Sequence, residues 1–153
     1  MKTRIPPPVL ACFATLVMWA LDRWLPLGMW LDSPWNWLGV LPIAAGLALD
    51  MASILLFQRA GTTVSPMNPG KTSMLVVDGV FRFSRNPMYL GLVLQLLGCA
   101  LWFGTASSFL IPPLFVMILT AWQIQPEESA LREKFGDAYL RYQSQTPRWL
   151  GRL

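Results

Sequence analysis

The uncharged stretch from Met88 to Trp122 constrains the fold more than any other feature, because its 35 residues include no Asp, Glu, Lys or Arg. A helix needs ~20 apolar residues to cross ~30 Å of hydrocarbon, so the stretch is too long for one membrane span and short for two. The polar segment 104–108 interrupts it near the middle. We therefore predict a helical hairpin with arms at about 87–103 and 107–123, the second bent by Pro112-Pro113.

The composition of the chain agrees with burial in lipid. Only 13% of its 153 residues are charged and 54% are hydrophobic, whereas soluble domains carry about 25% charge. A single domain is expected at this length. The absence of histidine excludes a histidine base, a histidine metal ligand and a His-containing catalytic triad. Cys12 and Cys99 lie in apolar runs without CxxC spacing, so neither a zinc site nor a disulfide framework is predicted.

Two further membrane spans are predicted before the hairpin, at about 6–23 and 38–58. A charged start followed by an apolar run also describes a signal peptide, but no small-x-small cleavage site follows here, which favours an uncleaved span. The connection 22–37 holds four of the eight tryptophans, whose amphipathic rings favour the membrane boundary. The predicted fold class is therefore an all-α integral membrane protein with about four transmembrane helices.

The C-terminal part is predicted to be a cytoplasmic amphipathic helix at about 126–143, because its apolar residues recur at helical spacing. With four spans, eleven of the twelve Lys and Arg residues fall on one side and only Arg23 falls on the other. This positive-inside asymmetry predicts that both termini are cytoplasmic, with the protein in a bacterial inner membrane. The net charge of +4 thus follows membrane topology, so we expect the lipid bilayer and no nucleic acid as a partner.

Polar side chains gather at both ends of the predicted hairpin, which a hairpin returns to the same membrane level. Arg85, Asn86, Pro87 and Tyr89 start the first arm, and Gln123, Glu127 and Glu128 follow at the end of the second. They offer a guanidinium for a carboxylate, an aromatic face for a cation and two carboxylates for an ammonium. This combination suits an amino-acid-like ligand with a positively charged centre.

Structural explanations exist for the same residues. Acidic residues in a first helical turn stabilise the helix dipole, and arginines beside a span can bind lipid phosphates. Asp50 within the second predicted span is a functional candidate because intramembrane carboxylates are costly. Its structural alternative is a protonated side chain hydrogen-bonded to Gln95 or Ser53.

Two motifs in this chain resemble one family. Residues 79–91 read G-V-F-R-F-S-R-N-P-M-Y-L-G, and residues 126–142 read P-E-E-S-A-L-R-E-K-F-G-D-A-Y-L-R-Y, followed by Pro147-Arg148. Their order and spacing resemble the isoprenylcysteine carboxyl methyltransferase and phospholipid methyltransferase group. The likeness covers roughly Phe57 to Trp149, and the two motifs together are specific where either alone is weak.

The resemblance implies that S-adenosylmethionine binds within a membrane-embedded fold that has no Rossmann sheet. The implied cofactor-binding residues are Arg85, Asn86, Pro87, Tyr89, Gly91, Glu127, Glu128 and Tyr139. Within this set Glu127 and Glu128 would hold the methionyl ammonium, and Tyr139 would shape a C-terminal cover together with Gly136 and Arg148. Many relatives have histidine where this chain has Asn86, so any proton transfer by that histidine is lost.

The favoured hypothesis is therefore methyl transfer from S-adenosylmethionine to a lipid-like or small amphipathic carboxylate, thiol or amine at the cytoplasmic membrane face. Arg85, Glu128 and Asp50 are the candidate catalytic residues. Two alternatives stay open: an NADPH-dependent membrane reductase of the sterol-reductase type, and a non-catalytic membrane protein that kept the fold. The methyl acceptor and the oligomeric state are left open too.

Overall fold

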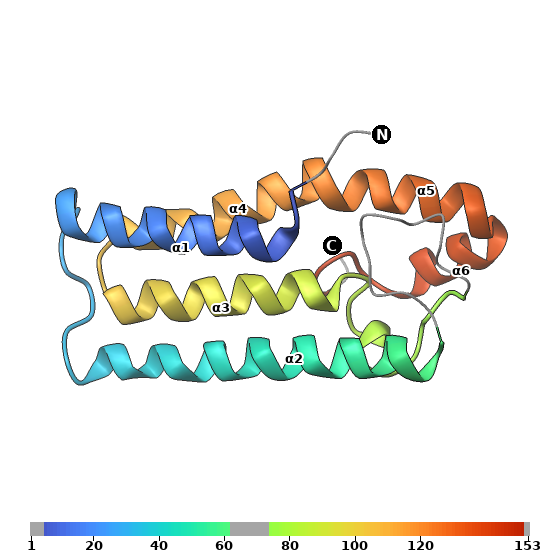
Figure 1. The fold of residues 1–153 in the computed structure, drawn as a ribbon, viewed down its shortest axis with the longest axis horizontal. Helices are drawn as coiled ribbons and strands as arrows, with labels where there is room; N and C mark the ends of the chain where they lie inside the picture. Colours follow the sequence, from blue (N-terminus) through green and yellow to red (C-terminus); the bar gives the residue numbers. More distant parts are fainter. Residues whose placement is uncertain (1–4, 62–73, 152–153) are drawn as a thin grey trace.

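The computed structural model describes residues 5–61 and 74–151; in this part of the chain helices are joined by turns and loops, and the only β-type pairing is one isolated bridge between Met29 and Thr105. Its helices are α1 (Pro7–Trp24), α2 (Val40–Arg59), α3 (Pro87–Phe103), α4 (Ile111–Leu119), α5 (Gln125–Phe135) and α6 (Asp137–Gln145). Short 3₁₀ turns are η1 (Trp35–Gly39), η3 (Gly79–Arg82) and η4 (Ser108–Leu110), and η5 (Thr120–Ile124) is a π-helix. Helices α1 to α4 lie side by side with their axes roughly parallel, α5 continues the line of α4, and α6 folds back (Figure 1).

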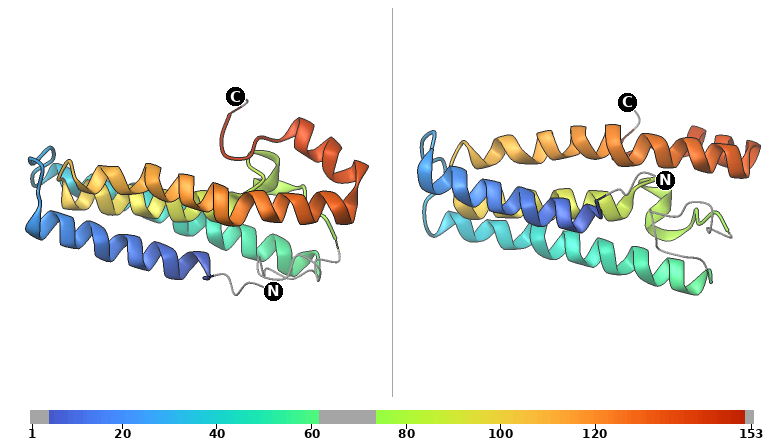
Figure 2. Two further views of the ribbon diagram at one scale, coloured as in Figure 1. Left: turned by 90° about the horizontal axis from the view of Figure 1, so that it is seen from above. Right: turned by 45° about the horizontal axis from the view of Figure 1, so that its top comes forward.

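Helix α3 lies at the centre of the array, because it packs against α1, α2 and α4 (Figure 2). Its buried Leu96 and Ala100 pack with Met18 of α1 and Leu119 of α4. These four side chains are at most 1% exposed. The apolar core therefore lies on one side of α3, and the other side is free to contact α2.

A glycine seam joins α2 and α3. Gly39, the last residue of η1 directly before α2, lies opposite Gly98, and Gly46 lies opposite Gly91, so each side of the seam offers two glycines seven residues apart. A Cβ atom added to any of the four would lie under 3.0 Å from the carbonyl oxygen of the glycine opposite. Small residues let helix backbones approach closely, and such packing drives helix association in lipid.

Two helices of the described chain are long and apolar enough to cross a membrane: Trp35–Arg59 and Ser108–Phe135. Helix α3 is apolar but shorter. The predicted all-helical, membrane-type fold is confirmed at this level. The helix Ser108–Phe135 has 28 residues, or ~42 Å at 1.5 Å per residue, which exceeds the ~30 Å of a hydrocarbon core.

Three details of the predicted helices were wrong. The single C-terminal helix predicted at about 126–143 is two helices, because Gly136 adopts a φ of +50° that breaks the helix between α5 and α6. The predicted second hairpin arm does not end before α5, since η5 joins α4 to α5 without a break. Pro112 and Pro113 do not bend this arm; they lie in the first turn of α4, where a missing N–H costs nothing.

The hairpin turn between α3 and α4 is fixed by Gly104. Its φ is +74°, and a Cβ atom there would collide with the Leu31 carbonyl. The backbone N–H groups of Trp30 and Leu31 donate to the Gly104 carbonyl at 2.7 and 3.1 Å, and the Trp30 ring stacks on Phe109. The tryptophan-rich connection is thereby tied to the end of the array opposite α5 and α6.

Candidate active site

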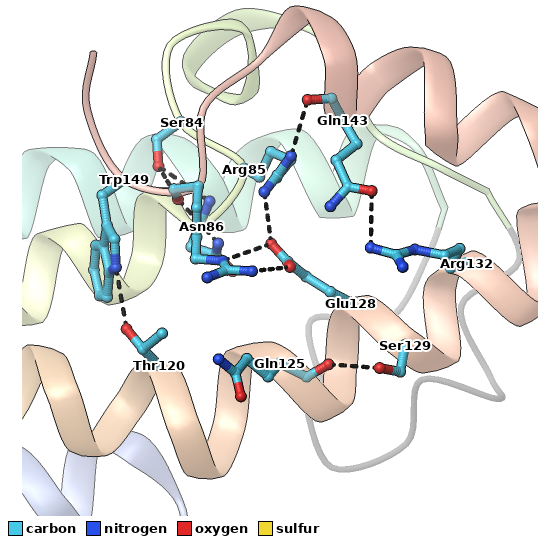
Figure 3. A network of polar contacts seen from close by, with 11 residues as sticks. Ser84, Arg85, Asn86, Thr120, Gln125, Glu128, Ser129, Arg132, Gln143 and Trp149 are labelled. Atoms are coloured by element: carbon cyan, nitrogen blue, oxygen red, sulfur yellow. Dashed lines mark hydrogen bonds and ion pairs between the residues drawn. The ribbon is translucent and has the colours of Figure 1, made fainter. Parts of the chain in front are cut away.

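Four segments of the chain meet where α3 begins. They are residues 84–86, the first turn of α5, the end of α6 and the residues 146–151, which we call the C-terminal strap (Figure 3). Pro87 occupies the first turn of α3 and favours a helix start at this point. The residues immediately before it are therefore held outside the helix, facing α5 and the strap.

Glu128 lies at the centre of this meeting point, between two arginines. Its Oε1 accepts a hydrogen bond from Arg85 Nη2 at 2.9 Å and one from Arg148 Nε at 3.1 Å, while its Oε2 accepts one from Arg148 Nη2 at 2.7 Å. The side chains of Arg85 and Glu128 are only 8% and 6% exposed, against 34% for Arg148. We call these three residues the ion triad; with two guanidiniums and one carboxylate it carries one excess positive charge.

Arg85 is held by more than its ion pair. Its Nη1 donates to the Gln143 carbonyl of α6 at 3.0 Å. Its Nε is buried and has no hydrogen-bond partner among the described residues. Since a buried unsatisfied donor is costly, this nitrogen is a position at which a ligand acceptor would be stabilised.

Tyr139 of α6 lies close to the ion triad and is 1% exposed. Burial, and secondly the Glu128 charge, raise the pKa of its phenol to about 12. Hydrogen bonding to Glu128 raises the pKa of the Arg148 guanidinium. At neutral pH Tyr139 is therefore neutral and Arg148 is charged.

A second contact links the start of α3 to α5. Tyr89 Oη donates to Glu127 Oε1 at 2.7 Å. The residues expected at the two ends of the hairpin, Arg85 and Tyr89 with Glu127 and Glu128, are thus brought together by the structure. Gln123, expected in the same group, instead donates its side-chain amide to the Ile5 carbonyl before α1.

The strap is bound to both neighbouring segments. The Arg85 backbone N–H donates to the Pro147 carbonyl at 2.9 Å, and Trp149 Nε1 donates to Thr120 Oγ1 at 3.2 Å. Thr120 begins the π-helix η5, a type of helix that often marks functional sites. The strap therefore spans from the start of α3 to the junction of α4 and α5.

A cavity of about 540 Å³ opens between the strap and these helices, a volume within the range of small-molecule sites. It is lined by Arg85, Thr120, Gln143, Ser144, Gln145, Thr146, Pro147, Arg148, Trp149, Leu150 and Gly151. Two of the three ion-triad residues therefore face one space of ligand size.

Asp50 and Gly91 lie elsewhere. Helix positions 89 and 91 are ~200° apart at 3.6 residues per turn, so Gly91 faces α2 while Tyr89 faces α5. Asp50 packs against Gly91 and accepts a hydrogen bond from Gln95 Nε2 at 2.7 Å. Gln95 is thus its partner as expected, whereas Ser53 donates to the Leu49 carbonyl.

Comparison with known proteins identifies the family. The sequence profile of the family described as phospholipid methyltransferase matches residues 35–138. The chain belongs to the phospholipid methyltransferase family. A protein-S-isoprenylcysteine O-methyltransferase from Schizosaccharomyces pombe is 32% identical to this family member over 77 residues, which is 50% of the chain and 33% of the relative. The family and this relative together indicate a membrane methyltransferase.

A second relative is an uncharacterized protein from Haemophilus influenzae. It is 43% identical over 63 residues, which is 41% of the present chain and 100% of the relative. The match to the yeast methyltransferase spans only about a third of that enzyme's length. No solved structure matches this phospholipid methyltransferase family member.

Sequence reasoning missed several residues of the site. Ser84, Gln143 and the Trp149–Thr120 contact were not expected, and Arg148 was expected only as part of a cover. The signal for Ser84 was its place between Arg82 and Arg85 inside the first motif. Gln143 contributes a backbone carbonyl to Arg85, and a backbone contact of this kind cannot be predicted from residue type.

Proposed function

We propose that this phospholipid methyltransferase family member transfers a methyl group from S-adenosylmethionine to a lipid-like or small amphipathic acceptor at the cytoplasmic membrane face. The observation that carries the proposal is the ion triad beside a cavity of about 540 Å³. The triad's excess positive charge suits an anionic group on a ligand, and the cavity lining runs from Thr120 at the junction of α4 and α5 to the C-terminal strap.

The residues at this site fit the amino-acid end of S-adenosylmethionine. Arg85 and Arg148 would hold its carboxylate, because the buried Arg85 Nε still has a donor to offer. Glu127, bonded to Tyr89, would hold its ammonium. Glu128 already binds both arginines, so its role would be to orient them.

Bound S-adenosylmethionine supplies a methyl group activated by its sulfonium. The work of the chain's own residues is to position the two reactants and to exclude water. The chain has no histidine to act as a base, so a carboxylate or thiolate acceptor is the simplest substrate. An amine acceptor must arrive neutral or give its proton to a carboxylate.

We assign Asp50 as the carboxylate that would face the methyl acceptor and take a proton from an amine. It lies between α2 and α3, and its Oδ1 is buried and without a partner among the described residues. Asp50→Asn should lower kcat while the Kd of S-adenosylhomocysteine stays unchanged. An unchanged kcat would remove Asp50 from the mechanism.

The proposed topology has four spans, with α1 and α3 crossing the bilayer beside Trp35–Arg59 and Ser108–Phe135. Both termini would be cytoplasmic and the membrane would be a bacterial inner membrane. Cysteine labelling from each side of oriented vesicles tests this arrangement. Labelling of a residue in the 25–34 connection from the cytoplasmic side would overturn it.

Binding calorimetry on detergent-purified protein tests the function, with S-adenosylmethionine, S-adenosylhomocysteine and NADPH as ligands. We expect micromolar binding of the first two, weakened in Glu127→Gln and Tyr89→Phe and unchanged in Glu133→Gln, which makes the same chemical change at an exposed position of α5. Binding of NADPH alone would indicate the reductase instead. Binding of none of the three would indicate a non-catalytic membrane protein.

A further inference from the structure

We infer that Ser84 and Asn86 are positioning residues: together they hold the Arg148 carbonyl, and through it they set the Arg148 guanidinium on Glu128. This inference rests on the proposed function, because it assigns the ion triad to the amino-acid end of the methyl donor. It also assigns Asn86 a different role from the direct cofactor contact that the sequence suggested.

The Arg148 carbonyl is bound on both of its lone pairs. Asn86 Nδ2 donates to it at 3.0 Å and Ser84 Oγ donates to it at 3.2 Å. Ser84 Oγ in turn accepts the Asn86 backbone N–H at 3.1 Å. A carbonyl oxygen has two acceptor sites, so this one is fully satisfied by a segment 62 to 64 residues earlier in the chain.

These two residues form a clamp that acts on the backbone of the strap. Ser84 is 1% exposed, whereas the Arg148 side chain is 34% exposed. A long side chain with access to water has many rotamers, and holding one geometry costs conformational entropy. Fixing the strap backbone limits the positions from which Arg148 can reach Glu128, which favours its two-bond contact with that carboxylate.

The cavity lining supports an indirect role for the clamp. The cavity is lined by Arg85 and Arg148 but not by Ser84 or Asn86. The side-chain donors of both clamp residues are also already used on the Arg148 carbonyl, so we expect them to act on a ligand through Arg148. Their effect on a ligand should be confined to the part that the arginines hold.

Two nucleosides that differ in this part provide the test. S-adenosylhomocysteine carries the amino-acid end, whereas 5′-methylthioadenosine lacks it and keeps the adenosine. We expect Ser84→Ala and Asn86→Ala each to raise the Kd of S-adenosylhomocysteine about tenfold, or about 1.4 kcal/mol. The Kd of 5′-methylthioadenosine should stay within about twofold, a difference of about 0.4 kcal/mol.

Matched variants separate positioning from general loss of structure. Ser129→Ala removes an exposed hydroxyl bonded to the Gln125 carbonyl and should change neither Kd. Asn86→His keeps an N–H donor and should recover much of the lost affinity, whereas Asn86→Asp removes the donor and should not. Equal weakening of both nucleosides in the alanine variants, or no weakening of either, would overturn the clamp.

A second measurement distinguishes failure of the clamp from failure of the proposed function. If the unsubstituted protein binds neither nucleoside, the proposed function fails, and amide hydrogen exchange then tests the clamp by itself. The Arg85 amide, which donates to the Pro147 carbonyl, should exchange at least about tenfold faster in Asn86→Ala, corresponding to about 1.4 kcal/mol. Exchange as slow as in the unsubstituted protein would show that Asn86 does not hold the strap.

Discussion

Glu128→Gln is expected to be the most destabilising polar substitution in the candidate active site. The variant keeps the size of the side chain but removes the charge that two guanidiniums share. Arg148 is 34% exposed and can turn toward water, so hydration partly compensates it for the lost ion pair. Arg85 is 8% exposed and cannot do so. Most of the cost is therefore that of one buried, unpaired arginine.

The magnitude follows from this asymmetry. Breaking a buried ion pair by removing one partner costs about 3–5 kcal/mol. Because only Arg85 stays buried, and because Gln can still accept one hydrogen bond, we expect the lower end, about 3 kcal/mol. For a chain of this size that lowers the Tm by roughly 6–12 °C.

Thermal unfolding in detergent measures this shift, and Asp78→Asn is its matched control. Asp78 pairs with Arg82 at 3.1 Å, but the two side chains are 72% and 71% exposed, so the loss should stay below about 1 kcal/mol. A fall in Tm for Glu128→Gln no larger than for Asp78→Asn would refute the argument. It would show that Arg85 finds water or another partner once Glu128 is neutral.

Two further predictions concern the glycine seam and alkaline pH. Gly46→Ala should lower the free energy of unfolding by roughly 1–3 kcal/mol, seen as a lower Tm, because the new Cβ collides with the Gly91 carbonyl. Ala48→Val, at an exposed position of the same helix, should have little effect. A stabilised Gly46→Ala would refute the close packing. The pKa of Tyr139 is about 12 in the folded protein against 10.0 when unperturbed, so the folded state keeps this proton after the unfolded state has lost it. The contribution of Tyr139 to stability should therefore be constant below about pH 10 and be lost between about pH 10 and 12, measured as Tm against pH; Tyr139→Phe should weaken the resulting fall in Tm, and an unchanged profile would contradict it.

Most of the helix positions could be predicted from hydropathy and from the proline and glycine residues that begin or end helices. The helix at Pro87–Phe103 follows from a proline at its start and Gly104 at its end. The joining of α4 to α5 could not be predicted, because Gln123 to Pro126 look like a loop in sequence. In the structure they are helical, and the Gln123 side chain donates to the Ile5 carbonyl, a contact between distant segments that the local sequence does not reveal.

The charged residues of the site could be predicted from the sequence, but not which arginines pair with Glu128. Arg85 lies close to Glu128, as expected from a hairpin that returns its two ends to the same level. That Arg148 shares the same carboxylate could not be predicted, since the strap's path depends on backbone carbonyls at Pro147 and Arg148 that any residue type would supply. The roles given to these residues in methyl transfer remain predictions.

The position of the strap along the chain has a consequence for the order in which the protein matures. Residues 146–151 leave the ribosome after every helix described here, yet they supply Arg148 to the ion triad and line much of the cavity. Under the proposed topology, α1 to α3 can therefore enter the membrane before Arg148 is available to the site. Ligand binding would thus report that synthesis has passed Trp149 and that the strap has docked, which membrane insertion alone does not.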